Sequence, residues 1–175
     1  MDLIIKNGTI VTAETTFKGD IAVTDGNIKA ISSKLPPGHK EATVVDAKGL
    51  LVLPGAIDGH THLEMPFGGT ISADSYEAGT RAAACGGTTT VFDFVLQDFG
   101  ENLVDAVKRR DALCAPQACV DYAFHTGVKD LSGDLIDSME QSVKYGVSSF
   151  KVFMVYDFGV TDGLFYQVLR KAKEV

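Results

Sequence analysis

The chain has 175 residues, of which 45% are hydrophobic and 22% charged, a composition typical of a folded globular protein. Its formal net charge of −7 argues against nucleic-acid binding, because phosphate recognition needs concentrated Lys and Arg. No apolar run approaches the roughly 18 residues that cross a bilayer, so membrane insertion is not expected. Three cysteines without metal-site spacing, Cys85, Cys114 and Cys119, indicate reduced thiols and a cytoplasmic protein.

Residues 1–54 are predicted to form a small β-sheet module. Asn7-Gly8 and Asp25-Gly26 both suit two-residue hairpin turns, which need positive φ at their central positions. A Pro-Pro-Gly loop at 36–38 precedes the last strands, and His39 in this loop is expected to face solvent. The expected strands are Leu3–Ile5, Thr9–Val11, Ile21–Val23, Ile28–Ile31, Thr43–Val45 and Leu50–Leu53.

Residues 55–175 show a different pattern, in which strand-like and helix-like segments alternate. Strands are expected at 56–62, 88–94, 119–125 and 147–155, and helices at 74–85, 102–115, 131–145 and 162–175. Such regular alternation predicts parallel strands with helical crossovers. Two α/β architectures fit it, an open doubly wound sheet and the first half of a (β/α)8 barrel, and periodicity does not choose between them.

The ends of the expected helices carry their own signals. Asp74 and Glu77 have the spacing of a capping box at the start of the first helix. Gly146 is placed to end the third helix, and Thr161 to cap the start of the fourth. These signals divide 55–175 into four strand–helix units.

The segment Ala56–His62 carries the first candidate site. Residues i and i+2 of a strand project from the same face, so His60 and His62 can converge on one cation through neutral imidazole nitrogens. Asp58 shares their parity and could orient one of these ligands by accepting a hydrogen bond from it. Catalytic groups of (β/α)8 barrels lie at the carboxyl ends of strands, which is where this pair is expected.

The second candidate is Lys151, a lone lysine inside the apolar run 147–155. Burying an ammonium is costly, so the side chain must be paired, neutral or chemically modified. A neutral amine can capture carbon dioxide, and the resulting carbamate is a carboxylate on a long stem that could bridge two metal ions. A structural ion pair is the alternative reading of this residue. His125, at the end of the third strand, could face the same pocket, with packing or support as its simpler role.

Two segments carry a family resemblance. Gly55–Thr70, GAIDGHTHLEMPFGGT, resembles the metal motif of the cyclic amidohydrolases, and is most similar to their hydantoinase and dihydropyrimidinase branch. Ser149–Tyr156, SFKVFMVY, resembles the carboxylated-lysine strand of that branch, and the β module resembles its amino-terminal segment. The resemblance therefore covers the whole chain and implies the first half of a (β/α)8 barrel preceded by a small β domain.

The resemblance also implies roles for individual residues. His60 and His62 would bind one metal ion, and Lys151, as N6-carboxylysine, would bridge two ions, zinc first, with manganese, cobalt or nickel as alternatives. Tyr156 would donate a hydrogen bond to the substrate carbonyl and to the oxyanion formed from it. The aromatic side chains expected to line the pocket for the exocyclic group of the substrate are Phe67 and Phe153. The implied reaction is ring opening of a hydantoin or dihydropyrimidine to an N-carbamoyl amino acid, by a tetrameric enzyme.

Substrate choice within the family has a local marker two residues after His62. Dihydroorotases typically carry Arg there and allantoinases often carry Asn, whereas this chain has Glu64, where the hydantoinase pattern usually has Asp. An acidic side chain beside the pocket would repel an anionic ring, so a neutral cyclic ureide is expected.

The chain does not supply every group that this reaction needs. The family takes two further histidines and an aspartate base from later strands, and no histidine follows Lys151 here. The isolated chain is therefore expected to be an inactive fragment of a longer enzyme. A non-catalytic scaffold on the same fold is the alternative from another class, although such relatives usually lack the two histidines. A nucleotide-binding open sheet is disfavoured, because no glycine-rich phosphate loop follows any strand.

Overall fold

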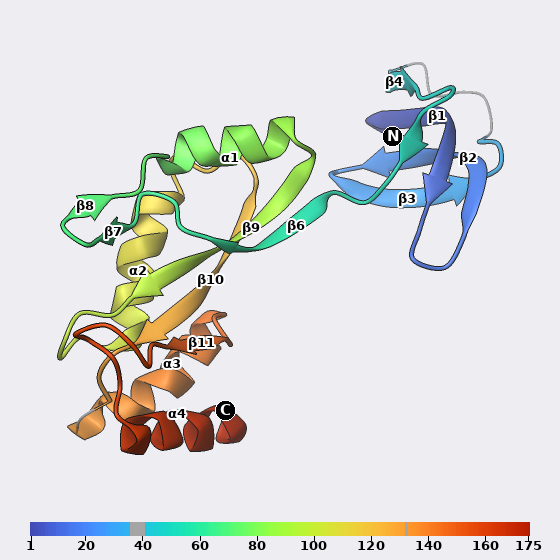
Figure 1. The fold of residues 1–175 in the computed structure, drawn as a ribbon. Coiled ribbons are helices and arrows are strands. Elements are labelled where there is room, and N and C mark those ends of the chain that lie inside the picture. The colour runs from blue at the N-terminus through green and yellow to red at the C-terminus, as the bar shows by residue number, and fades with distance from the viewer. Residues whose placement is uncertain (36–40, 132) are drawn as a thin grey trace. The chain divides into compact units, whose positions relative to one another are not determined.

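The computed structural model describes residues 1–35, 41–131 and 133–175 (Figure 1). The predicted loop at 36–38 and His39 lie outside the described residues. The chain divides into two compact units, Met1–Pro54 and Gly55–Val175. No helix in the described ranges is long and apolar enough to cross a lipid bilayer.

The first unit is a five-stranded sheet in which β1 is central. β1 pairs antiparallel with β2 and parallel with β4 and β5, and β3 extends the sheet beyond β2 (Figure 1). Its small core gathers around Ile4, Ala22 and Leu35. The strands are β1 (Leu3–Val11), β2 (Thr16–Thr24), β3 (Asn27–Ser32), β4 (Thr43–Asp46) and β5 (Leu51–Val52).

Of the two hairpin turns expected in this unit, one forms. Asp25 and Gly26 have φ of 51° and 70° and join β2 to β3, as predicted. The prediction for Asn7-Gly8 is wrong, because these residues form a bulge inside the continuous strand β1. Asp20 accepts a hydrogen bond from the Asn7 amide at 2.9 Å, and a Cβ on Gly8 would meet Val52 at 2.5 Å. The positive φ of Asn7 therefore belongs to a bulge between packed strands and not to a hairpin turn.

The second unit contains a four-stranded parallel sheet in the order β11-β10-β9-β6 (Figure 1). Its strands are β6 (Ala56–Thr61), β9 (Thr88–Leu96), β10 (Asp121–Val128) and β11 (Phe150–Val152), and β7 (Pro66–Phe67) with β8 (Thr70–Ile71) forms a separate hairpin. The spatial order of the four strands follows the chain without reversal. A doubly wound sheet would reverse its order at a switch point, so this topology is that of successive barrel units.

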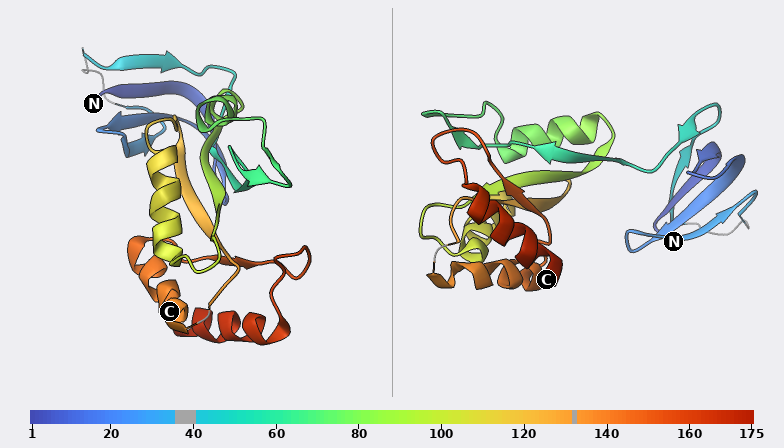
Figure 2. Two further views of the ribbon diagram at one scale, coloured as in Figure 1. Left: turned by 90° about the vertical axis from the view of Figure 1, so that its left-hand side faces the viewer. Right: turned by 60° about the horizontal axis from the view of Figure 1, so that its bottom comes forward.

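Four α-helices accompany this sheet, and Figure 2 shows α2 and α3 one after the other along the same side of the strands. They are α1 (Tyr76–Cys85), α2 (Leu103–Cys114), α3 (Ser138–Tyr145) and α4 (Asp162–Glu174), with a short 3₁₀ helix at Gly133–Asp137. Apolar residues of α1 and α2 pack on β9 and β10 in one core cluster, which includes Val95, Val107 and Phe124. This packing buries one face of the sheet and leaves its other face for the site.

The local signals at the helix ends were partly right. Thr161 caps α4, where its hydroxyl accepts from the Leu164 amide at 3.3 Å, and Gly146 ends α3 with φ of 116°, both as predicted. The predicted capping box at Asp74 is wrong, because Ser75 is the cap and accepts from Ala78 at 3.2 Å. The carbonyl of Asp74 instead accepts a hydrogen bond from the loop that follows β6.

Two predicted elements are shorter than expected. The helix predicted over 131–145 begins as the 3₁₀ turn Gly133–Asp137 and becomes α-helical only at Ser138. The strand predicted over 147–155 is reduced to Phe150–Val152. Beyond it the Phe153 carbonyl accepts from the Val160 amide at 2.7 Å, which closes a loop instead of extending the strand.

Candidate metal centre and pocket

The aromatic ring of Phe94 is the point around which the predicted ligands gather. Alternate residues of β9 face opposite sides of the sheet, so Phe94 faces away from the helices that contact its neighbour Asp93. The ring centroids of His60 and His62 lie 4.5 and 4.9 Å from that of Phe94, and 5.0 Å from each other. The two imidazoles therefore meet at the carboxyl end of β6.

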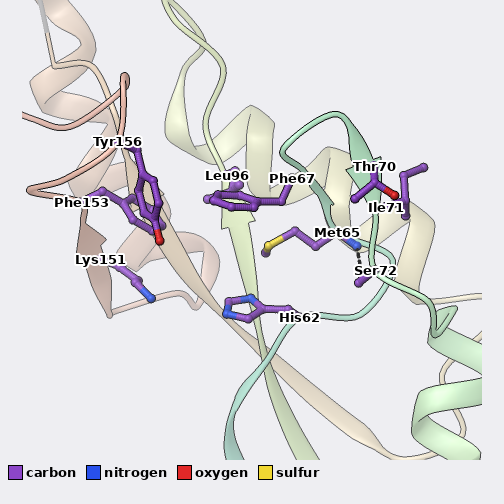
Figure 3. Close-up of a pocket in the computed structure, with 10 residues that line it drawn as sticks. All are labelled: His62, Met65, Phe67, Thr70, Ile71, Ser72, Leu96, Lys151, Phe153 and Tyr156. Atoms are coloured by element: carbon purple, nitrogen blue, oxygen red, sulfur yellow. Dashed lines mark hydrogen bonds between the residues drawn. The ribbon is translucent and has the colours of Figure 1, made fainter.

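Lys151 reaches the same ring from β11, at the opposite edge of the sheet. Its Nζ lies 4.5 Å from the centroid of Phe94 and 5.0 Å from that of Phe153, and the side chain is half-buried. No ion pair to this ammonium is found within the part of the chain that the structure describes. Figure 3 shows the amine of Lys151 and the ring of His62 pointing toward one another. The fold thus brings the three candidate ligands together.

The donor set fits a dinuclear centre only if Lys151 is modified. No group of three His, Cys, Asp or Glu side chains with metal-binding geometry occurs among the residues described. Two imidazoles alone are too few for a stable divalent site, and an ammonium would repel a cation. A carboxylate on the Lys151 amine would supply the missing oxygen donors at this position. The residues present would therefore fit part of a two-metal site if Lys151 carried a carboxylate.

The surroundings of His62 lower the pKa of its imidazole. Burial lowers the pKa of His62 most, and its electrostatic interaction with the neighbouring His60 ring lowers it further, whereas the Asp93 carboxylate acts in the opposite direction. Metal ligation needs the deprotonated nitrogen of a neutral ring. The environment of His62 thus favours the form that could bind a metal ion.

Two side chains near the pair were expected to support it. The Asp58 carboxylate accepts a hydrogen bond from the His60 backbone amide at 3.1 Å, so it contacts the strand and not an imidazole. His125 is on β10, which lies between β9 and the edge strand β11. Its Nε2 is 3.0 Å from the Gly59 carbonyl of β6, and its Nδ1 is 2.5 Å from the Ser149 hydroxyl, just before β11. Because a carbonyl only accepts, Nε2 is the donor to Gly59, and Nδ1 pairs with the Ser149 hydroxyl, which also lies 3.5 Å from the Phe124 carbonyl. His125 therefore links β6 to the residues that precede Lys151.

A cavity of about 390 Å³ opens beside His62 and Lys151 (Figure 3). Both predicted pocket residues, Phe67 and Phe153, line it, and so does Tyr156. The lining residues that the sequence patterns did not single out are Met65, Thr70, Ile71, Ser72 and Leu96. Thr70 and Ile71 belong to the short β7–β8 hairpin and Met65 and Ser72 flank it directly, so the Gly-Gly turn of this hairpin was the one available signal. The cavity is therefore mainly apolar, with its polar groups supplied by His62, Thr70, Ser72, Lys151 and Tyr156.

Tyr156 reaches the cavity from the loop after β11. Its backbone has φ of 72°, and its ring lies 5.4 Å from Phe67, edge to face, and 5.4 Å from Phe158, stacked. A positive φ at a non-glycine residue is uncommon and requires support from its surroundings. The aromatic contacts provide that support and orient the hydroxyl toward the space near Lys151 (Figure 3).

The interpretation of Glu64 as a charge beside the pocket is wrong. Its carboxylate accepts from the Tyr76 amide at 3.4 Å, at the amino-terminal end of α1, and it does not line the cavity. A carboxylate at a helix N-terminus is stabilised by the unpaired amides there. The expectation of a neutral substrate must therefore rest on the apolar lining and not on repulsion by Glu64.

Comparisons with known proteins agree with this geometry. Residues 51–175 match the Amidohydrolase family. The chain is 43% identical to a D-hydantoinase of Geobacillus stearothermophilus and 42% identical to a dihydropyrimidinase of Dictyostelium discoideum, covering 100% and 99% of this chain. It also superposes on the crystal structure of dihydropyrimidinase from Brevibacillus agri NCHU1002 with a TM-score of 0.94, at 41% identity and over 99% of this chain.

The chain belongs to the amidohydrolase family. Its homologues there include hydantoinases and dihydropyrimidinases, and its parallel sheet is part of a (β/α)8 barrel that follows a β-rich segment. The chain spans 37% and 35% of the lengths of the two enzymes named above, and 38% of the solved dihydropyrimidinase. It thus corresponds to about the first third of these relatives.

Proposed function

We propose that this chain contributes to a metal-dependent hydrolase that opens the ring of a hydantoin or dihydropyrimidine to give an N-carbamoyl amino acid. The observation that carries the proposal is the gathering of two imidazoles and Lys151 around Phe94, beside an apolar cavity. The names of the homologous enzymes support the same chemistry.

His60, His62 and a carboxylated Lys151 would hold part of a centre of two divalent ions, with zinc as the first choice and manganese, cobalt or nickel as alternatives. Once deprotonated, the Lys151 amine would add to the carbon of carbon dioxide and lose a further proton, which would give an N6-carboxylate whose oxygens could ligate metal ions. When bound, two such ions lower the pKa of a water molecule and polarise the substrate carbonyl. Asp58 supports His60 through its backbone amide, at the strand end that carries both imidazoles.

The aromatic side chains of this chain bind and orient the substrate. Phe67 and Phe153 contact its exocyclic group, and the mainly apolar cavity favours an uncharged cyclic ureide over an anionic ring. The Tyr156 hydroxyl donates a hydrogen bond to the ring carbonyl and to the oxyanion that forms when water attacks it. Because the loop backbone and the stacked ring of Phe158 fix Tyr156, this donor is in place before the reaction.

The general base and the remaining metal ligands come from barrel strands beyond those of this chain. A base must take a proton from the attacking water and return one to the leaving nitrogen. No aspartate or glutamate is among the described residues that line the cavity. We therefore expect hydrolysis only from a protein that combines this chain with the rest of the barrel, and none from the 175 residues alone.

The test is ring opening by that longer protein after reconstitution with zinc. We expect hydrolysis of hydantoin and dihydropyrimidine rings and a loss of more than about 100-fold on His62→Ala, since even residues behind metal ligands affect activity by 10–100-fold. Unchanged hydrolysis in that variant would contradict the metal assignment. Absence of hydrolysis in the metal-loaded parent protein would favour a scaffold function instead.

We expect a homotetramer in the cytoplasm, without nucleic-acid or membrane partners. Its three cysteines are all free, as expected in a reducing compartment. Sedimentation of the longer protein measures the assembly state, and a monomer at micromolar concentration would contradict the tetramer.

A further inference from the structure

A buried polar cluster lies behind the loop that follows His62. It consists of Asp93 of β9, Arg110 of α2 and Tyr76 of α1, called here the Asp93 cluster. The Asp93 Oδ2 accepts from the Tyr76 hydroxyl and, at 2.8 Å, from Arg110 Nη2. Asp93 and Tyr76 are 0% exposed and Arg110 is 7% exposed. Three elements thus contribute one polar side chain each to an otherwise apolar core.

The remaining hydrogen bonds of the cluster reach the backbone directly after His62. Asp93 Oδ1 accepts from the Leu63 amide at 3.2 Å, and Arg110 donates to the carbonyls of Leu63 and, at 3.1 Å, of Glu64. This backbone has left the sheet, and Glu64 has φ of 46°. Side chains therefore replace the ladder hydrogen bonds that would otherwise hold the chain at this point.

Stability alone does not account for such a cluster. A buried ion pair can often be replaced by packed apolar side chains without loss of stability, because desolvation offsets its attraction. Arg110 even leaves its Nε without a partner within the described part of the protein. The cluster fixes the position of two consecutive peptide groups, those of Leu63 and Glu64, through directional hydrogen bonds. Apolar packing would not provide this restraint.

We propose that Asp93, Arg110 and Tyr76 are positioning residues for His62. By fixing the Leu63 and Glu64 peptides, they set the direction in which the chain leaves β6 and so the place of the imidazole beside His60. This inference rests on the proposed metal function for its consequence, since His62 must be a ligand for its position to affect metal binding. The backbone restraint itself does not depend on that function.

Tyr76→Phe and Tyr122→Phe form a matched pair of variants. Each removes one hydroxyl that donates to a carboxylate in the same unit, Asp93 for Tyr76 and Asp111, at 2.7 Å, for Tyr122. Tyr122 packs against the same core cluster but has no hydrogen bond to the loop after His62. A general loss of packing would therefore affect both variants, whereas loss of positioning would affect only the first.

The first measurement is hydrogen–deuterium exchange of peptides covering residues 60–66 in the metal-free longer protein. We expect Tyr76→Phe to speed exchange there by about fivefold, the effect of weakening one hydrogen-bonded network, and Tyr122→Phe to leave it unchanged. Equal exchange in the two variants would overturn the proposed restraint. Because no metal is present, this result is independent of the proposed function.

The second measurement is the rate of zinc release to a chelator. Tyr76→Phe should release zinc about tenfold faster than the parent, and Tyr122→Phe at the parental rate. Faster exchange without faster release would overturn the link to His62. A parent protein that binds no zinc would contradict the proposed function, while the exchange result would still decide the restraint.

A second pair of variants tests the proposal even if Tyr76→Phe does not fold. Arg110→Lys keeps the charge but cannot reach both carbonyls at once, and Arg109→Lys changes the neighbouring arginine, which pairs with Glu101 at the surface. We expect faster exchange at 60–66 only in Arg110→Lys. The same exchange rate in both lysine variants would overturn the proposal.

Discussion

The Nζ of Lys151 lies 4.5 Å from the centre of the Phe94 ring, although the two residues belong to β11 and β9, which β10 separates in the sheet. The ring faces this ammonium and both imidazoles of the site. An aromatic face attracts a cation but offers it no proton acceptor. Lys151 is therefore held at the site without a carboxylate partner among the described residues, which leaves its amine available for modification.

Substitution of Lys151 tests whether that amine becomes a metal ligand. Lys151→Ala in the longer protein should lose bound zinc and reduce ring opening by more than about 100-fold. Added acetate or propionate should restore part of both, because a small carboxylate can occupy the vacated space. Metal analysis and hydrolysis rates measure the effect, with Lys173→Ala, an exposed change on α4, as control. Full metal content and activity in Lys151→Ala would refute the bridging role.

Removal of the Tyr156 hydroxyl tests the oxyanion donor. Tyr156→Phe should reduce kcat by about 10²–10³-fold, as for other single donors to an oxyanion, with a smaller change in KM. Tyr156 is 58% exposed, so stability should be unaffected. Tyr166→Phe removes a similarly exposed hydroxyl on α4 and serves as the control. Equal kcat values in the two variants would remove Tyr156 from the reaction.

Truncation of Phe153 tests the pocket for the exocyclic group. Phe153→Ala should lower kcat/KM for a 5-aryl hydantoin by about tenfold more than for unsubstituted hydantoin, because only the larger substrate contacts the ring. Steady-state kinetics with both substrates measure this ratio. Phe99→Ala, a change at a 70% exposed side chain, should leave the ratio at its original value. An unaltered ratio in Phe153→Ala would place the exocyclic group elsewhere.

Buried protonated groups predict how the Gly55–Val175 unit responds to alkali. Burial raises the pKa of the Cys114 thiol from 9.0 to about 12, and burial with the Asp93 hydrogen bond raises that of the Tyr76 hydroxyl. The fold retains protons that the unfolded chain releases, so the stability from these neutral groups is complete below pH 9 and declines as the pH rises toward 12. Equilibrium unfolding measured across this range should show that decline.

Thiol labelling gives a site-specific check of the same core. At about pH 8, Cys85 and Cys119 should react with iodoacetamide, because both are exposed, whereas Cys114 should react only after unfolding. Mass spectrometry of the labelled peptides identifies the sites. Labelling of native Cys114 at the rate of Cys85 would show that the core around α2 is not packed as described.

Much of the α/β unit could be predicted because its signals are local. The apolar spacing of α2 and the cap at Thr161 lie within a few residues of the elements they define. The wrong prediction of a turn at Asn7-Gly8 has a different cause, because it depends on contacts with residues distant in the sequence. Whether Asn7-Gly8 makes a turn or a bulge depends on Asp20 and Val52, which are remote in the sequence.

The site could be predicted less completely. The spacing of His60 and His62 and the lone lysine in an apolar run were sufficient signals for three residues. Arg110 was missed, although it occupies a position of the buried α2 stripe with Val107 and Cys114, where a charged residue is unexpected. Its significance depends on Asp93 and on the loop after β6, a relationship that only the fold reveals.

The central claim is that His60, His62 and a carboxylated Lys151 share one dinuclear centre. Anomalous diffraction from crystals of the longer protein grown with zinc and bicarbonate tests it most directly. We expect two zinc peaks about 3.5–4 Å apart, one of them next to both imidazoles. We also expect electron density for a planar three-atom group on Nζ of Lys151. An unmodified amine at Lys151, with zinc bound away from both histidines, would contradict the account.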